Sequence, residues 1–207
     1  MRKLSATILA ASFTAAIASA PADPAFGFAE QPLFVSIGGS VRAPIGWVEF
    51  CAENPRDCAR GSSAAQDAVL NARTWNELVR INAQVNDAVS PMTDQDHYGV
   101  LEKWGFPDDG YGDCEDYVLL KQHLLITAGW PPSALLITVV RDHRGDGHAV
   151  LTVKTDKGEF ILDNQHPDIL LWSETRYRYV KRQSQTNPNV WVALGDPRPA
   201  QATASSQ

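Results

Sequence analysis

Residues 110–132 read Gly-Tyr-Gly-Asp-Cys-Glu-Asp-Tyr-Val-Leu-Leu-Lys-Gln-His-Leu-Leu-Ile-Thr-Ala-Gly-Trp-Pro-Pro and contain one helix with its start and stop signals. Asp113 is a suitable N-cap residue, and the acids that follow Cys114 suit the first turn because the helix dipole favours negative charge there. Gly129, followed by two prolines, ends the helix. We therefore predict a helix from Cys114 to Ala128.

The segments on either side of this helix predict the fold class. Upstream, the capping box Thr74-x-x-Glu77 and apolar residues at helical spacing predict a helix that ends before Pro91. Residues 93–112 read as a long irregular loop. Strand-like segments are residues 33–37, 134–141, 148–154, 159–163, 176–182 and 190–194. Helices followed by strands predict an α+β fold, with N-terminal helices packed on an antiparallel β-sheet.

The length of 207 residues suggests one domain, and the first twenty residues predict export. Residues 1–20 combine a basic start, an apolar stretch and a small-residue cleavage pattern, which is typical of a signal peptide. The globular domain then covers residues 21–195, and residues 196–207 form a disordered tail. We expect a periplasmic or secreted protein. With a net charge of −6 and no Lys/Arg-rich block, the chain is not expected to bind nucleic acid.

Three cysteines in an exported chain leave one thiol unpaired. Cys51 and Cys58 flank the turn signal Asn54-Pro55, which can bring their sulfur atoms together. A bond from either residue to Cys114 is the alternative, but it would consume the cysteine with the most distinctive surroundings. We favour a structural disulfide between Cys51 and Cys58.

Cys114 is the candidate nucleophile. The N-terminus of a helix presents free N–H groups and a positive dipole end, which favour a thiolate. The alternative, an inert buried cysteine, fits poorly with the three acids that flank it, Asp113, Glu115 and Asp116. The same acids pose a problem, because their negative charge raises the pKa of the thiol.

A cysteine nucleophile needs an imidazole, and His148 is the best placed of the five histidines. His123 lies about half a turn away from Cys114 on the helix surface and cannot meet its thiol. A hairpin loop at residues 155–158 pairs Lys154 with Glu159, which makes His148 and Asp163 diagonal neighbours on one face of the sheet. A surface strand histidine is the alternative for His148 alone, and Asp163 favours the catalytic interpretation.

The motifs Gly112-Asp-Cys-Glu-Asp-Tyr117, Gly147-His-Ala-Val150 and Leu162-Asp-Asn164 resemble those of the bacterial transglutaminase-like cysteine proteinases. The resemblance covers roughly residues 30–195. It implies a papain-like thiol protease fold in which Cys114 is the nucleophile, His148 the base and Asp163 the orienting group. The family includes a periplasmic protease that releases large adhesins involved in biofilms.

The resemblance also implies cofactors and partners. Calcium would be held by Asp113 and Glu115, whose charge it would offset; the alternative is that Asp113 only caps the helix and the other acids are solvated. No organic cofactor is expected. The substrate would be a protein such as a large surface adhesin, and an inner-membrane receptor would regulate the enzyme.

Within the site, the Cys114 backbone N–H and, from its position alone, the Trp104 side chain are the expected oxyanion donors. The alternatives to peptide hydrolysis are transglutaminase or amidase chemistry on the same triad, or a non-catalytic peptide-binding module.

Overall fold

The computed structural model describes residues 32–59 and 64–195 of the chain. The predicted signal peptide, residues 1–20, and the predicted tail, residues 196–207, lie outside the described residues. In the described part of the chain, no helix is long and apolar enough to cross a membrane.

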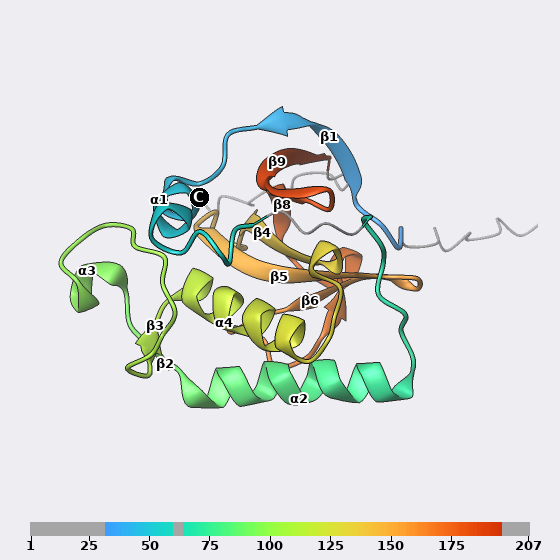
Figure 1. The fold of residues 1–207 in the computed structure, drawn as a ribbon, viewed down its shortest axis with the longest axis horizontal. Coiled ribbons are helices and arrows are strands. Elements are labelled where there is room, and N and C mark those ends of the chain that lie inside the picture. Colours follow the sequence, from blue (N-terminus) through green and yellow to red (C-terminus); the bar gives the residue numbers. More distant parts are fainter. Residues whose placement is uncertain (1–31, 60–63, 196–207) are drawn as a thin grey trace, which may run out of the picture. The chain divides into compact units, whose positions relative to one another are not determined.

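A seven-stranded sheet in the order β1-β9-β8-β4-β5-β6-β7 forms the framework of the fold (Figure 1). Every neighbouring pair in it is antiparallel. Its strands are β1 Ser36–Val41, β4 Leu135–Arg141, β5 Gly147–Thr155, β6 Gly158–Leu162, β7 Leu170–Leu171, β8 Arg178–Ser184 and β9 Asn187–Gly195. The five strands predicted after the central helix correspond to β4, β5, β6, β8 and β9, which confirms the α+β class.

Two long helices cover one face of this sheet (Figure 1). The helix α4, Cys114–Thr127, packs against β5, and α2, Ala72–Ala88, packs against α4. The shorter elements are α1 Ile45–Glu53, β2 Ser90–Pro91, α3 Asp94–His97, β3 Tyr111–Gly112 and the 3₁₀ turns η1 Pro132–Ala134 and η2 Trp172–Glu174. Because α4 packs against α2 and also against strands β4 and β5, its side chains are buried on two sides.

Sequence predictions about local structure need correction at three places: the start of α2, the loop at residues 93–112, and the strand at residues 33–37. The helix α2 begins at Ala72, because Asn71 is its N-cap and accepts hydrogen bonds from the backbone N–H groups of Arg73 and Thr74. The Thr74 hydroxyl accepts from the Asn71 N–H, so the capping box starts three residues earlier than predicted. Residues 93–112 contain α3 and β3 rather than irregular loop alone.

The strand expected at residues 33–37 is also shifted. The first strand, β1, begins at Ser36, because the chain before it is held by the start of β6. The Glu159 N–H donates to the Leu33 carbonyl, and the Glu159 side chain accepts from the Val35 N–H.

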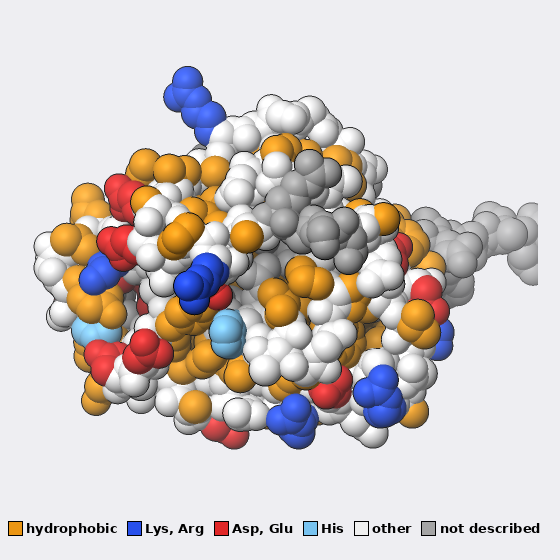
Figure 2. Space-filling view, viewed as in Figure 1, with side chains coloured by type: hydrophobic (Ala, Val, Ile, Leu, Met, Phe, Trp, Pro, Cys, Tyr) orange, Lys and Arg blue, Asp and Glu red, His pale blue; other side chains and the backbone are white. Residues whose placement is uncertain are grey.

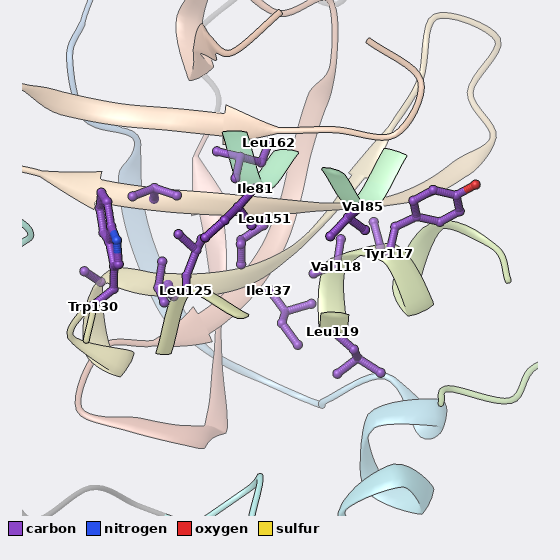
Figure 3. Packing of buried hydrophobic residues seen from close by; sticks show 14 of the residues in the cluster. Ile81, Val85, Tyr117, Val118, Leu119, Leu125, Trp130, Ile137, Leu151 and Leu162 are labelled. Atoms are coloured by element: carbon purple, nitrogen blue, oxygen red, sulfur yellow. The ribbon is translucent and has the colours of Figure 1, made fainter. Parts of the chain in front are cut away.

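The main core lies between the helices and the sheet (Figure 3). Ile81 and Val85 of α2 meet Val118 and Leu125 of α4, and these pack onto Leu151 of β5. Each is almost fully buried. A buried side chain of this size contributes about 1.5–3 kcal/mol, so this layer fixes α4 against β5.

The β5–β6 hairpin has the register that the sequence predicts. Lys154 pairs with Glu159, and Gly158 has a φ of +127°, a conformation that favours glycine. Leu151 and Leu162 are the last pair of the ladder before Asp163. This register places Asp163 beside the N-terminal end of β5.

Candidate active site

Cys114 is the first residue of α4, and Asp113 is its N-cap. The preceding Gly112 allows close approach of the chain: a Cβ atom there would lie 2.7 Å from the Asp116 Oδ2 atom. Asp116 in turn accepts a 3.3 Å hydrogen bond from the Asp113 N–H. The thiol therefore stands on a tightly built helix start, where it is partly exposed and free of any disulfide.

The thiol lies against the start of β5. The backbone N–H of Ala149 is close enough to the Cys114 sulfur to act to lower its pKa. Ala149 follows His148 directly in the chain. The nucleophile candidate and the histidine candidate are therefore brought to the same end of the same strand.

His148 and Asp163 form a buried pair. The Nε2 atom of His148 lies 2.9 Å from Oδ1 of Asp163, and the two residues are only 4% and 2% exposed. An ionised carboxylate only accepts hydrogen bonds, so Nε2 carries the proton and Nδ1 is left as an acceptor. This is the pairing that the hairpin register predicts.

Two further donors serve the Asp163 carboxylate. The Tyr177 hydroxyl donates to Oδ2, and the Gln165 backbone N–H donates to Oδ1 at 2.9 Å. Burial alone raises the pKa of Asp163, but the hydrogen bonds from His148, Tyr177 and Gln165 outweigh it and hold the pKa below its ordinary value. Asp163 therefore stays ionised beside the imidazole.

The free nitrogen of His148 has a weaker partner. Its Nδ1 atom lies 3.3 Å from the exposed Gln165 side-chain amide, and among the described residues no hydrogen bond joins His148 to the Cys114 thiol. Two other histidines lie elsewhere: His97 pairs with Asp109 at 2.8 Å, and His123 is half exposed beside Asp57. His166 lies beside Tyr177, with the two ring centroids 6.1 Å apart.

The acids around the thiol are crowded and buried. Glu115 accepts a hydrogen bond from Cys114 Sγ at 3.1 Å and is only 5% exposed. Burial and the neighbouring Asp113 raise the pKa of Glu115 to about 9. Burial, followed by the charge of Glu115, raises the pKa of Cys114 well above its ordinary value. Without a compensating charge, the thiol is therefore a poor nucleophile.

A second group of carboxylates meets the first at Asp113. Oxygen atoms of Asp94, Asp113 and Asp116 lie within 4.8 Å of one another, as do ligand atoms of Asp113, Cys114 and Glu115. One Asp113 oxygen, Oδ1, is buried with no hydrogen-bond partner among the described residues. Burial, the charge of Asp113 and that of Asp94 raise the pKa of Asp116 to about 7. Figure 2 shows further acidic side chains on this side of the molecule, over the region of α3 and β3.

Sequence reasoning named Asp113 and Glu115 here but missed Asp94. Asp94 lies in α3, within the segment that the sequence predicts to be an irregular loop. Thr93 before it is the N-cap of α3, and this residue type is the sequence signal for a turn of helix here. Tyr177 was also missed, because it reaches Asp163 from a segment 14 residues away and no local pattern marks such a contact.

The structure gives the Trp104 side chain another partner. Its indole N–H donates to Glu102 Oε1 at 2.7 Å, and the ring is 5% exposed. Trp104 also packs against Gly46, where a Cβ atom would lie 2.2 Å from the ring. An N–H engaged in this way is not free to bind an oxyanion, so the predicted oxyanion role of Trp104 finds no support in the geometry.

The predicted disulfide is present. Cys51 and Cys58 are bonded, with their Cα atoms 5.5 Å apart, which leaves Cys114 as the free thiol of the described residues. The bond links the last turn of α1 to the chain that follows this helix, and both cysteines pack in or against the main core. Its role is structural.

Comparison with known proteins identifies the family. The family model described as bacterial transglutaminase-like cysteine proteinase (BTLCP) matches residues 37–199. No curated protein sequence matched significantly. Among solved structures, calcium-bound LapG of Legionella pneumophila matches with a TM-score of 0.51 and 24% identity, covering 59% of this chain and 72% of that one.

Two further LapG structures from the same organism match less well in overall shape. One has a TM-score of 0.49 and 26% identity, covering 57% of this chain and 68% of that one. The EGTA-treated form has a TM-score of 0.48 and 26% identity, covering 60% and 72%. The calcium-bound structure shows that the fold is shared, and the family match extends over most of the chain, including Cys114, His148 and Asp163. The chain belongs to the bacterial transglutaminase-like cysteine proteinases.

Proposed function

We propose that this cysteine protease is exported and hydrolyses a peptide bond with Cys114 as nucleophile, His148 as general base and Asp163 as the orienting group. The observation that carries the proposal is the buried 2.9 Å hydrogen bond from His148 Nε2 to Asp163. It fixes the imidazole at the N-terminal end of β5, next to Ala149, whose backbone N–H acts to lower the pKa of the thiol.

The reaction then follows from the protonation states. His148 Nδ1 takes the thiol proton, after its contact with Gln165 opens, and the thiolate attacks the carbonyl carbon. The new C–S bond forms a tetrahedral intermediate, which collapses as the C–N bond breaks and His148 protonates the leaving amine. Water, deprotonated by His148, hydrolyses the thioester and restores the thiol. Throughout, Asp163 stabilises the imidazolium and keeps its ring in place.

The oxyanion would be stabilised by the first turn of α4. The Cys114 backbone N–H belongs to the first turn of a helix and has no carbonyl four residues earlier within that helix. Such an N–H, aided by the helix dipole, is a suitable donor for a developing negative charge.

The acidic residues fit a calcium ion. Carboxylate oxygens converge from Asp94, Asp113 and Asp116, and the unpartnered Oδ1 of Asp113 is buried among them. We propose that Asp113 and Glu115, with Asp94 and Asp116 nearby, hold Ca²⁺, and the calcium-bound form of the similar LapG structure supports this. The ion would supply positive charge that offsets the acids and lowers the pKa of Cys114.

The substrate and location are part of the proposal. We expect a protein substrate, with a large surface adhesin as the specific class and an inner-membrane receptor as regulator, since the family resemblance implies both. A disulfide is stable in an oxidising compartment, which supports export to the periplasm or beyond. Cell fractionation and N-terminal sequencing of the mature protein test this; an uncleaved chain in the cytoplasm would refute it.

Three active-site variants test the mechanism. The assay measures the rate of hydrolysis of fluorescein-labelled casein in buffer that contains CaCl₂. We expect Cys114→Ala, His148→Ala and Asp163→Asn each to lower this rate by about 10³-fold or more. His123→Ala is the matched control, because this histidine lies on the same helix but is half exposed, and it should keep wild-type activity. Full activity of Cys114→Ala would refute the nucleophile. Incorporation of dansylcadaverine instead of cleavage would indicate acyl transfer to amines.

A further inference from the structure

Two exposed arginines lie side by side at the active-site end of the sheet, and the mechanism above does not use them. Arg141 is the last residue of β4, and its direct partners are Arg178 on β8 and Gly147 on β5. All three positions are exposed. Like charges directly opposite each other on neighbouring strands destabilise a sheet, so the stability of the fold does not explain this pair.

The row formed by Gly147, Arg141 and Arg178 lies on the face of the sheet that α4 covers. Side chains alternate along a strand, so Gly147 is on the same face as Ala149, two residues further on, and direct cross-strand partners share that face. Ala149 belongs to the core between α4 and the sheet, and Cys114 packs against the same core. The two arginines are therefore on the same face of the sheet as the thiol.

The spacing of the sheet sets the distance between this row and the thiol. Residues rise about 3.4 Å along an antiparallel strand and neighbouring strands lie about 4.8 Å apart, so the Cα atom of Arg141 is about 8 Å from that of Ala149. An extended substrate advances by the same rise, which places Arg141 within about three residues of the scissile bond. A Cβ atom on Gly147 would meet no atom of the described residues within 4 Å, so the position between Ala149 and the arginines is open.

Both guanidinium groups keep donors for a ligand. Arg141 uses one N–H, which donates to the Gly145 carbonyl at 2.8 Å and holds the side chain to the β4–β5 turn. The two acids of that turn pair with Arg144, at 3.4 and 3.3 Å. In the described part of the chain, no ion pair joins a carboxylate to Arg141 or Arg178. A guanidinium binds a carboxylate through two parallel hydrogen bonds, so an acidic ligand fits this pair.

We propose that Arg141 and Arg178 form a substrate subsite that binds an acidic side chain, Asp or Glu, within about three residues of the scissile bond. The inference rests on the proposed hydrolysis at Cys114 and names the class of peptide on which that site acts. A carboxylate bound between the two guanidinium groups offsets their mutual repulsion. Because the subsite acts by binding, its loss changes KM more than kcat.

Cleavage of a peptide library tests the subsite. The library is a chymotryptic digest of a bacterial lysate, incubated with the enzyme in CaCl₂ and low salt, and mass spectrometry identifies the new peptide ends. With the wild type, we expect Asp and Glu to be enriched about fivefold or more at one position within three residues of the cut. The double variant Arg141→Gln/Arg178→Gln should lose this enrichment. The double variant Arg141→Glu/Arg178→Glu should instead enrich Lys and Arg at the same position.

Arg80→Gln is the matched control, because it removes one charge from an exposed arginine of α2 that donates to Gln84 at 3.0 Å. It should keep the wild-type preference. For one cleaved peptide and its counterpart with Gln in place of the acid, the wild-type kcat/KM should differ by about tenfold, mostly through KM. The difference should shrink in about 0.5 M NaCl, because salt screens exposed charges. The melting temperature of the Gln double variant should equal or exceed that of the wild type.

Three outcomes would overturn the inference. They are a wild-type enzyme with no acidic preference near the cut, the same acidic preference in the Glu double variant, and an equal loss of kcat/KM for the acidic and neutral peptides in the Gln double variant. The last outcome would mean that the arginines only support the fold. Full activity of Cys114→Ala would refute the proposed function instead, and the charge swap, scored by position relative to the cut, would still decide the subsite.

Discussion

Tyr177→Phe should show how much the buried carboxylate of Asp163 depends on its donors. The Tyr177 hydroxyl donates to Oδ2, whereas His148 and the Gln165 N–H both donate to Oδ1. The substitution removes one oxygen atom and leaves Oδ2 buried without this donor. A hydrogen bond to a charged group contributes about 1.5–3 kcal/mol, and we expect a loss of unfolding free energy in that range.

The loss can be measured as a change in melting temperature. For a chain of this length, about 1 kcal/mol corresponds to roughly 2–4 °C, so we expect a decrease of about 3–12 °C at pH 7 by differential scanning calorimetry. Burial and the adjacent Asp163 charge raise the pKa of Tyr177, so its hydroxyl stays protonated throughout this experiment.

The pH dependence separates a charge effect from a packing effect. The pKa of Asp163 is lowered in the folded protein, so its stabilisation is present above the unfolded pKa of about 4 and is lost as the pH falls through the folded value. Without Tyr177, the folded pKa rises toward the ordinary one. The difference between wild type and variant should therefore be largest near neutral pH and should narrow below about pH 4.

Tyr179→Phe is the matched control. Its hydroxyl lies 3.0 Å from the neutral Thr175 hydroxyl, and the residue is buried to about the same extent as Tyr177. We expect a loss of about 1 kcal/mol that does not vary between pH 3 and 7. Equal, pH-independent losses in the two variants would refute the view that Tyr177 stabilises an ionised Asp163.

Two further predictions concern calcium and the disulfide. Glu115→Gln should leave the melting temperature in EGTA nearly unchanged, because the raised pKa of about 9 keeps Glu115 protonated at pH 7 without a cation. Added CaCl₂ should raise the melting temperature of the variant less than that of the wild type. An equal rise in both proteins would contradict Glu115 as a calcium ligand. Replacing both Cys51 and Cys58 by Ala should lower the free energy of unfolding by about 2.5 kcal/mol, the loop-closure value for a separation of seven residues. Urea denaturation measures this loss, and an unchanged midpoint of unfolding would contradict a stabilising role for the disulfide.

The sequence predicts most of the framework because its signals are local. The start of α4 follows from Asp113 and Gly112, and the β5–β6 register follows from a short hairpin that ends in Gly158. Both depend on residues within a few positions of each other. Because the turn sets which residues of β5 and β6 lie opposite each other along the whole hairpin, it also predicts that His148 and Asp163 are neighbours. The 2.9 Å contact between their side chains confirms this.

Signals of this kind fail where distant segments meet. The N-cap of α2 was misplaced because Thr74 fits two overlapping capping patterns, and Asn71 is the stronger N-cap. The Trp104 indole is close to the site in the chain, but its direction is set by Glu102 and by contact with Gly46. Sequence distance says nothing about the direction of a side chain.

The acids around Cys114 show why composition alone could not settle the electrostatics. From sequence, Glu115 and Asp116 are first-turn residues of a helix, where exposed acids are common and stabilising. In the structure both are almost fully buried, and α3 brings Asp94 against Asp113 and Asp116 from 19 and 22 residues away. Burial with no basic partner among the described residues turns a favourable helix start into a site that disfavours a thiolate, because burial and each neighbouring carboxylate raise the pKa of these groups. A cation would reverse the sign of that field, so the feature that opposes catalysis in the bare protein is also the one that would make catalysis depend on calcium.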